Sequence, residues 1–558
     1  MKRRLYNILE LTIQDCFKQG KLNKTPLPDY VIEVPNNPDH GHFATNLPMV
    51  LASFQKRRPI EIAGILVENL KDDKKCIEKA EIAGPGFVNF LIKKREWHKV
   101  LSKILTLKND YGRSNLGAGE KILVEFVSAN PTGPLHIGHG RGAALGDTLC
   151  RILSFCGYEV IREFYINDAG QQVRLLGESI YSRWKQMADP NYPFPENGYH
   201  GEYVLELAEE ISKEVDLSAL NQDEALTQCA DMGKEKMLEE IRRDLSRFQS
   251  FFDVWYKESD LYSSGLFEHS LEMIRDKGEF YEKDGAMWIK TSAFGDDKDR
   301  VIRKNDGHYT YFASDISYHL EKWKRGFSKA INIWGADHHG YVQRVKAALK
   351  ANNLDEAWLS VLLIQLVKIW KGGQEIKMSK RSGQYITLKE LLDEVGVDAA
   401  RFVFLTKNHD SPLDFDIDLV KKNDSDNPVY YVQYAHARIC SIFRKAASEG
   451  ISLPDKSDEF LDRLVLDEEI ILIRLMDEFS SLLEDISRTL EPHRLTYYLT
   501  DLASSFHKYF NLGLQMPEKR IVNQDKTLSY ARLFLAEGIR AVLKNGLKLI
   551  GVNAPGRM

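Results

Sequence analysis

Residues 122–140 decide the fold of this chain, and they read Ile-Leu-Val-Glu-Phe-Val-Ser-Ala-Asn-Pro-Thr-Gly-Pro-Leu-His-Ile-Gly-His-Gly. The apolar run at 122–127 predicts a short buried strand, and the proline and glycine residues after it predict a turn. Residues 140–155 then predict a helix. The order is therefore a strand, a loop large enough to hold a phosphate, and a helix.

Further apolar runs extend this pattern along the chain. Residues 330–334 and 361–367 predict later buried strands, with helices between them. Such alternation predicts an α/β fold with a Rossmann-like, doubly wound parallel sheet. The polar segment at about 188–300 interrupts the alternation, and we interpret it as an insertion. This central unit is expected to span residues 119–422.

The two flanks differ from the centre in their patterns. Residues 1–118 predict a small N-terminal α+β domain, with helices at 5–20 and 60–70 and a strand at 86–92. After the polar stretch that ends at 426, strand signals disappear and amphipathic helical spacing continues to the last residue. Residues 423–558 therefore predict an all-α helical bundle.

Composition narrows the class of protein. With 558 residues, 43% of them hydrophobic, the chain can build two to four cores. A net charge of −5 neither supports nor excludes a nucleic acid, because local basic patches can still bind one. The 6 cysteines form no Cys-x-x-Cys pair, and no apolar run approaches the roughly 18 residues that span a bilayer. We expect a reduced, cytoplasmic protein without a membrane segment.

Two histidines mark the start of the helix after the phosphate-sized loop. Free N–H groups and the positive dipole end at a helix start attract an anion, and His136 and His139 can add donors. Gly138 lacks a Cβ and lets a flat base approach the backbone, so ATP is the expected ligand. The alternative is a metal site completed by His338 and His339, but no acidic or thiol ligand stands beside the pair at helical spacing.

A second candidate motif lies about 240 residues later. Residues 375–383 read Glu-Ile-Lys-Met-Ser-Lys-Arg-Ser-Gly and follow the glycine pair 372–373. A basic loop between glycines can close over a triphosphate and neutralise the charge of departing pyrophosphate. Alone the motif is weak, because most short basic loops are solvated turns or import-like patches.

Together and in this order, the two motifs resemble the paired signatures of class I aminoacyl-tRNA synthetases. The resemblance implies that His136 and His139 contact phosphate oxygens and that Lys377 and Lys380 hold the pyrophosphate. It also implies Mg²⁺ on the phosphates and four further ATP-binding residues, namely Gly138, Gly140, Met378 and Ser379. Because the amino-acid carboxylate is itself the nucleophile, catalysis consists of positioning and charge stabilisation.

Several stretches resemble the arginyl branch of this class and cover nearly the whole chain: 125–134, 165–170, 252–255, 334–341, 398–402 and 554–558. The resemblance implies L-arginine and tRNA(Arg) as substrates. It places Glu125, Tyr311 and Asp315 at the guanidinium, Asn130 at the α-amino or carboxylate end, and Gln343 in the same pocket. Any single acidic residue is more often a solvated carboxylate.

Arginine presents a forked, permanently charged group that lysine cannot reproduce, so such a pocket can discriminate without proofreading. The insertion also looks too small for a large editing domain. Many arginyl enzymes replace the second lysine of the basic loop, whereas this chain keeps Lys380. Lys380 is therefore expected to fill that role itself.

The flanking units are expected to contact tRNA. By resemblance, Phe87 and Asn89 meet an unstacked D-loop base, although core packing of Phe87 is an equal alternative. The C-terminal bundle resembles an anticodon-binding domain, but aromatics spaced as in 427–438 and 506–510 are more often bundle core than base platforms. The family expectation is a monomer. Competing hypotheses are another class I synthetase, a small adenylyltransferase, and a catalytically silent RNA-binding relative.

Overall fold

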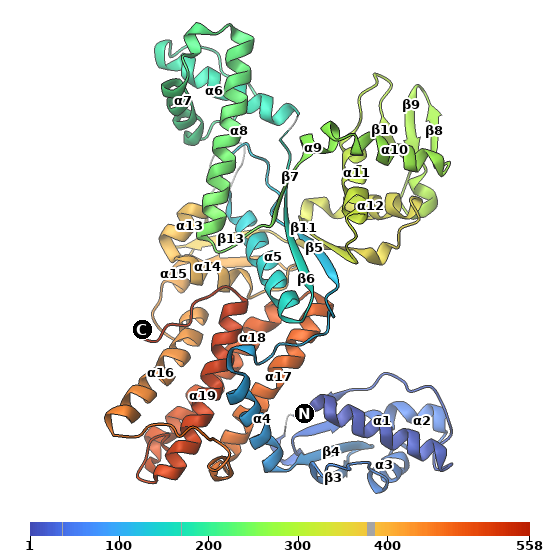
Figure 1. Cartoon of the computed structure of the whole chain (residues 1–558), viewed down its shortest axis with the longest axis vertical. Helices are drawn as coiled ribbons and strands as arrows, with labels where there is room; N and C mark the ends of the chain where they lie inside the picture. Colours follow the sequence, from blue (N-terminus) through green and yellow to red (C-terminus); the bar gives the residue numbers. More distant parts are fainter. Residues whose placement is uncertain (36, 169, 377–385) are drawn as a thin grey trace.

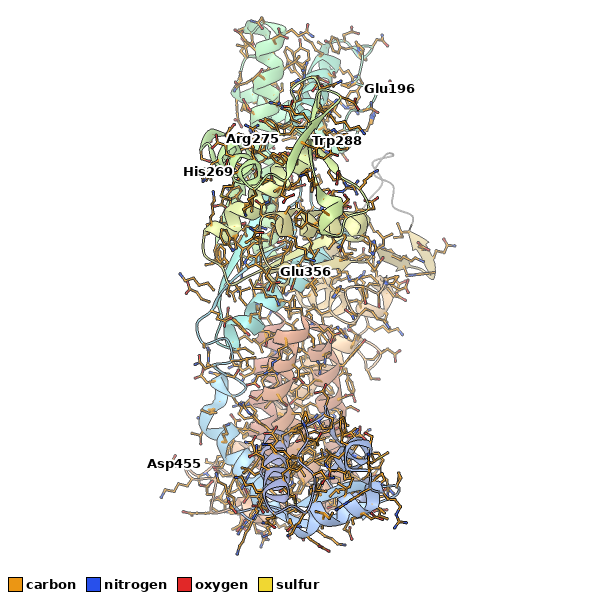
Figure 2. All side chains as sticks on the ribbon, turned by 90° about the vertical axis from the view of Figure 1, so that its right-hand side faces the viewer. Glu196, His269, Arg275, Trp288, Glu356 and Asp455 are labelled. Atoms are coloured by element: carbon orange, nitrogen blue, oxygen red, sulfur yellow. The ribbon has the colours of Figure 1, made fainter. Side chains whose placement is uncertain are left out.

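The computed structural model describes residues 1–35, 37–168, 170–376 and 386–558. The molecule is elongated, with the N-terminal unit beside a helical bundle at one end and two smaller units at the other (Figure 1). In the view turned by 90°, Glu196 and Asp455 lie toward opposite ends of the long axis (Figure 2). Among the described residues, no helix combines the length and apolar character needed to cross a bilayer.

A five-stranded parallel sheet forms the centre of the molecule. Its order is β12-β11-β5-β6-β7, and every neighbouring pair is parallel. The strands are β5 (Lys121–Glu125), β6 (Glu159–Ile166), β7 (Val254–Lys257), β11 (Lys329–Gly335) and β12 (Leu359–Ile364). The chain winds outward from β5 in one direction and then, starting at β11, in the other. This is the predicted doubly wound Rossmann-like sheet, with its switch point between β5 and β11.

Close packing explains the sequence of β5 and the helix after it. Ile122, Leu123 and Val124 are buried, as expected for a parallel strand covered on both faces. Helix α5 (Ile137–Phe155) lies against the sheet, and Gly146 allows this approach because a Cβ there would meet the ring of Phe126 at 2.3 Å. The helix starts three residues before the predicted position because His136 caps it.

The segment expected to form one insertion at 188–300 contains two units, so that prediction is wrong. Strand β7 runs between them and pairs with β6 in the central sheet. The first unit packs three helices around its own core, and the second contains a three-stranded antiparallel sheet. These elements are α6 (Gln171–Ala188), α7 (Glu202–Glu214), α8 (Gln222–Arg247), β8 (Phe280–Lys283), β9 (Ala286–Ile289) and β10 (Arg300–Arg303). Strand β7 is only four residues long, and its place in the central sheet comes from its pairing with β6, about ninety residues earlier in the chain.

The predicted strand at 361–367 is also divided in two. Strand β12 ends at Ile364, and a new strand, β13 (Val367–Lys371), begins a separate sheet with β14 (Gln374–Ile376) and β15 (Leu413–Asp416). The antiparallel β13–β14 pair leads directly to residue 377. Helices α13 (Leu388–Val395) and α14 (Val397–Phe404) follow.

The N-terminal unit is α+β, as predicted. Its antiparallel sheet has the order β1-β2-β4-β3. The elements are α1 (Lys2–Lys18), β1 (Ile32–Glu33), β2 (Phe43–Thr45), α2 (Leu47–Gln55), α3 (Pro59–Glu68), β3 (Ile77–Ala83) and β4 (Phe87–Ile92). In β4, Val88, Phe90 and Ile92 enter the core. Phe87 and Asn89 alternate with them and therefore lie on the other face.

The C-terminal bundle is all-α, as predicted. It contains α16 (Pro428–Ser448), α17 (Asp467–Thr489), α18 (His493–Gln515) and α19 (Lys526–Leu549). Helix α4 (Lys94–Leu107), which leaves the N-terminal unit, packs against α17 and α19 (Figure 1). This helix joins the N-terminal unit to the bundle, and the N-terminal ammonium of Met1 adds an ion pair with Asp477 of α17.

Arg401 joins the end of the C-terminal bundle to the central unit. The side chain is fully buried on α14 and donates to the carbonyls of Phe248 and Ile550, both at 2.8 Å. It also donates to Asp147 of α5 at 2.5 Å. A single guanidinium therefore joins α5, the end of α8, α14 and the end of α19.

Replacing Arg401 should destabilise the whole protein. Arg401→Met removes a donor from Asp147 and from two buried carbonyls, and we expect a loss of about 3–5 kcal/mol in the free energy of unfolding. Urea unfolding followed by tryptophan fluorescence measures it. Arg58→Met is the control, because the Arg58–Glu61 pair is exposed and its loss should cost less than about 1 kcal/mol. Equal midpoints for the two variants would contradict the assignment.

Candidate active site

The two predicted histidines cap the N-terminus of α5. The N–H of Gly138 donates to His136 Nδ1 at 3.1 Å, and the backbone N–H of His136 donates to His139 Nδ1 at 3.2 Å. The two rings stack with centroids 3.7 Å apart and an interplanar angle of 17°. The pair therefore stands as one rigid unit at the positive end of the helix dipole.

This capping arrangement also fixes the tautomers. Because each Nδ1 accepts a hydrogen bond, each neutral ring carries its proton on Nε2. Each ring is then a donor at Nε2, but the Nε2 atom of His136 is buried in this structure and has to be uncovered before it can reach a ligand. The geometry suits an oxyanion at the helix start, as the sequence predicted for ATP phosphates.

The two glycines of the motif have different surroundings. A Cβ on Gly138 would lie 3.0 Å from Cε1 of His136, so glycine leaves room for the imidazole as well as for a ligand. Gly140 is buried, and a Cβ there would meet Leu388 at 2.8 Å and Phe404 at 3.1 Å. The structure thus shows a packing position for Gly140 between α5 and helices α13 and α14.

A cavity of about 580 Å³ opens in front of the histidines. Asn130 and the turn at 132–134 form one side with His136 and His139, and Asn130 Nδ2 donates to Gln172 Oε1 at 2.6 Å. The opposite wall is the loop 196–201 with Tyr203, from the first inserted unit. Tyr203 bridges the two walls, since its hydroxyl donates to the carbonyl of Thr132 at 2.8 Å.

The sequence analysis did not predict this loop as part of the site. Its only signal is composition, because residues 197–203 read Asn-Gly-Tyr-His-Gly-Glu-Tyr and combine glycines with ring and amide donors. Glu196, at the start of the loop, is visible at the edge of the molecule in Figure 2. The loop is held to α6 by the N–H of Tyr199, which donates to Ser179 Oγ at 3.0 Å.

Behind the turn, a row of polar side chains crosses the sheet at the end of β5. Glu125 pairs in register with Glu163 of β6 and with Asn332 of β11, so the three lie side by side. All three are buried. Helix α11 (Tyr311–Lys324) supplies their partners: Tyr318 donates to Glu163 at 2.5 Å, and Lys322 donates to Glu125 at 2.5 Å and to Asn332 at 3.1 Å.

Asp315 lies on the same helix and is strongly perturbed. Burial is the main cause that raises the pKa of Asp315 to about 7; the Glu258 and Glu125 carboxylates act in the same direction, and the hydrogen bond from Tyr341 opposes them. Burial, together with the Asp168 carboxylate, also raises the pKa of Glu258 to about 7. These carboxyl groups raise one another's pKa values, and a nearby cation would stabilise their ionised forms.

Three other members of the predicted arginine pocket have mixed outcomes. Asn130 does line the cavity beside the histidines. Tyr311 begins α11 one turn before Asp315 and on the same face, but its side chain is 68% exposed. Gln343 of α12 (His339–Ala351) donates to the carbonyl of Gly295 at 3.2 Å, so the structure does not bring it to Asp315. Tyr341, which the sequence analysis missed, makes that contact.

The structure places the remaining predicted residues as follows. Lys377, Met378, Ser379 and Lys380 lie outside the described residues. Phe87 is half-buried and Asn89 buried on β4, far along the chain from the cavity. Within the described ranges, no group of three or more His, Cys, Asp or Glu side chains has a metal-binding arrangement. The His338 ring lies instead near Trp334 and Tyr341.

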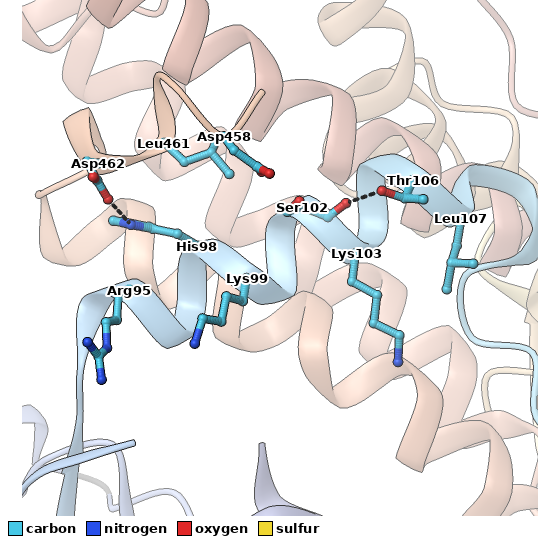
Figure 3. Close-up of a pocket in the computed structure, with 10 residues that line it drawn as sticks. All are labelled: Arg95, His98, Lys99, Ser102, Lys103, Thr106, Leu107, Asp458, Leu461 and Asp462. Atoms are coloured by element: carbon cyan, nitrogen blue, oxygen red, sulfur yellow. Dashed lines mark hydrogen bonds and ion pairs between the residues drawn. The ribbon is translucent and has the colours of Figure 1, made fainter. Parts of the chain in front are cut away.

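A second cavity, of about 560 Å³, lies between α4 and residues 458–462 of the bundle (Figure 3). Arg95, Lys99 and Lys103 leave the same side of α4, away from Asp458. His98 faces Asp462 at 3.1 Å across its end. None of the predicted site residues lines this cavity.

Comparison with known proteins matches the whole chain. Residues 5–92 match the arginyl tRNA synthetase N terminal domain, 100–439 the class I (R) tRNA synthetase catalytic domain, and 432–558 the DALR anticodon binding domain. The arginine–tRNA ligases of Desulfosudis oleivorans and Syntrophotalea carbinolica are 47% and 45% identical, each over 100% of both chains. The arginyl-tRNA synthetase of Thermus thermophilus shares the fold, with a TM-score of 0.77 at 21% identity over 100% of both chains. The chain therefore belongs to the arginyl-tRNA synthetase family.

Proposed function

We propose that this chain activates L-arginine with ATP and transfers the arginyl group to the 3′-terminal adenosine of tRNA(Arg). The observation that carries the proposal is the junction at the end of β5. There a helix start with two Nε2–H donors stands next to a negative pocket formed by Glu125 and Asp315. One site can thus hold the triphosphate of ATP at one end and the guanidinium of arginine at the other.

In the first step, the arginine carboxylate attacks the α-phosphorus of ATP, and the bond to the bridging oxygen of pyrophosphate breaks. His136 and His139 donate from Nε2 to phosphate oxygens as negative charge moves onto them. Lys377 and Lys380 take the same role at the pyrophosphate, as the family motif implies. In the second step, a ribose hydroxyl of the tRNA attacks the arginyl carbonyl carbon and AMP departs.

The arginine side chain fits the negative pocket. Asp315 and Glu125 offer carboxylate oxygens to the two edges of a planar guanidinium, and Tyr311 on the same helix supplies an aromatic wall. Asn130 lies by the histidines, where the α-amino or carboxylate end of the substrate must be. Gln343 would join only if it released the carbonyl of Gly295.

Partners follow from the same proposal. Mg²⁺ accompanies ATP, because this ion is usually held by substrate phosphates together with one or two carboxylates. The tRNA contacts Phe87 and Asn89 through its D-loop and the α16–α19 bundle through its anticodon arm. We place the enzyme in the cytoplasm and expect it to act as a monomer.

ATP–pyrophosphate exchange with each of the twenty amino acids, with and without tRNA(Arg) transcript, tests the function. Of the twenty amino acids, only arginine should drive exchange. Lys380→Ala should abolish most of the arginine-dependent exchange, because the departing pyrophosphate loses a charge partner. Aminoacylation of the transcript with labelled arginine is the second readout. Exchange driven by a different amino acid would overturn the pocket, and no exchange with arginine and its tRNA would favour the silent RNA-binding alternative.

The tautomer argument predicts different outcomes for two substitutions at one position. In His139→Asn, the amide oxygen can replace Nδ1 as acceptor for the His136 N–H, but nothing replaces the Nε2 donor. In His139→Gln, the amide nitrogen reaches nearer the Nε2 position. We expect kcat for exchange to fall about 10²–10³-fold in the asparagine variant and clearly less in the glutamine variant. The reverse order would contradict donation from Nε2.

Arginine affinity should depend on pH near neutrality. The raised pKa of about 7 means that folded Asp315 and Glu258 keep a proton that the unfolded chain releases near pH 4. Stability without substrate therefore falls as pH rises from about 4 to 7. A bound guanidinium stabilises the ionised carboxylates. The affinity for arginine should therefore rise as the pH approaches 7 and level off above that pH.

Isothermal titration with arginine at pH 6 and pH 8 measures this effect. The dissociation constant should be at least about fivefold lower at pH 8, given up to a tenfold change per pH unit for one group. Asp315→Asn should bind arginine more weakly and show a flatter pH dependence. Equal affinities at the two pH values in the unmodified protein would refute the assignment of these carboxyls.

A further inference from the structure

The ammonium of Lys322 is a fully buried charge beside the proposed arginine pocket. Its side chain is 0% exposed, and Nζ donates to Glu125 Oε2 and to Asn332 Oδ1. The same ammonium lies 4.3 Å from the ring centroid of Tyr318. No role in the reaction follows from the function proposed above, which needs only carboxylates at this end of the substrate.

Stability alone gives a weak reason for this arrangement. Burying an ammonium and a carboxylate costs several kcal/mol per ion in desolvation, and apolar replacements for such pairs are often neutral or stabilising. Ile316 and Leu320 of α11 pack into an apolar core, but they leave the helix in other directions than Lys322. Lys322 lies on the face of Asp315, Tyr318 and His319, where the side chains are polar or amphipathic.

The hydrogen bonds show what Lys322 does to its partner. Glu125 Oε2 accepts from Lys322, while Oε1 accepts from Ser128 Oγ at 2.9 Å. Both oxygens are held, so the plane of the carboxylate has one orientation. Each oxygen has a second lone pair, which leaves capacity for a forked donor.

The network continues from Lys322 to the backbone of Asp315. Asn332 Nδ2 donates to His319 Nε2 at 2.9 Å, and His319 Nδ1 then donates to the carbonyl of Asp315 at 2.7 Å. Burial, followed by the Lys322 ammonium, lowers the pKa of His319 to about 3, which keeps this ring neutral and its Nε2 an acceptor. One neutral tautomer of His319, with its proton on Nδ1, therefore satisfies both of these hydrogen bonds.

We propose that Lys322 is a positioning residue of the arginine pocket, which holds the Glu125 carboxylate in the orientation that receives the substrate guanidinium. The inference rests on the proposed function, because it takes arginine as the substrate. Lys322 has no contact with the substrate in this account and acts only through Glu125. It is an internal cation that balances the negative charge of Glu125.

The first test is Lys322→Met, which keeps the length of the side chain and removes its charge. Arginine should bind at least tenfold more weakly by isothermal titration, and KM for arginine in pyrophosphate exchange should rise in parallel. KM for ATP should change less than twofold, because the histidine end of the site is untouched. A folded variant with unchanged arginine affinity would overturn the proposal.

Arg325→Met is the matched control. Arg325 is on the same helix and pairs with Glu163, the neighbour of Glu125 in the polar row, with distances of 2.6 and 3.0 Å. Losing it should lower the unfolding temperature without raising the arginine dissociation constant more than twofold. A similar loss of affinity in both variants would mean that Lys322 acts through general stability.

A double-mutant cycle keeps the test decisive even when Lys322→Met folds poorly, because Glu125→Gln removes the charge left unpaired. If Lys322 acts only through Glu125, the double variant should bind arginine within twofold of Glu125→Gln alone. If the double variant instead lost arginine affinity by the product of the two single-variant factors, the proposal would be overturned. Arginine-dependent exchange in the unmodified protein is measured alongside, since its absence would refute the proposed function instead.

Discussion

The pairing of β5 between β6 and β11 is the constraint on which the site depends. Because all three strands are parallel, their carboxyl ends meet at one edge of the sheet, and the crossover directions diverge there. The turn after β5 can then enter the space between the diverging connections and start α5 with its N-terminus facing a ligand. The same register puts Glu125 beside Glu163 and Asn332. The phosphate end and the charged end of the site thus follow from one strand alignment.

Apolar burial and charge have different roles at this edge of the sheet. Apolar burial of α5 and β5 fixes where the helix begins, and His136 and His139 satisfy its first N–H groups. Charge then determines which ligand fits. The polar row under α11 is fully bonded, and the perturbed carboxyls Asp315 and Glu258 lie in front of it. In the proposed function, a substrate guanidinium would bring its positive charge to these carboxyls.

Much of the fold could be predicted because its signals are local. The apolar run at 122–127, the turn after it and the helix at 140–155 lie within forty residues, and the alternation of strands and helices follows the same rule. Strand β7 could not be found this way, since its pairing with β6 is set by residues far away in the chain. The single expected insertion was wrong for that reason.

The residues of the candidate site could likewise be predicted only where they are neighbours in the sequence. His136, His139 and Asn130 share one turn, so adjacency in sequence placed them together. Gln343 was expected to complete the arginine pocket, yet it donates to Gly295 while Tyr341 contacts Asp315, because side chains two apart on a helix leave it in different directions. The position of Lys322 near Asp315 could have been predicted, because residues seven apart lie on the same face of a helix. Nothing in the sequence linked it to Glu125.

Three separate cores meet around the reacting position. Helix α5 belongs to the large central core, the loop at 196–201 to the unit of α6, α7 and α8, and helix α11 to the unit that contains β9 and β10. Polar contacts join these bodies at the site, namely Tyr203 to Thr132, Asn130 to Gln172 and Lys322 to Glu125. The first two carry less free energy than apolar burial and can be exchanged for contacts with a ligand, whereas Lys322, as proposed, keeps its bond to Glu125 while the substrate binds. The polar contacts at the site therefore divide into those that a ligand can replace and one that holds the pocket in shape.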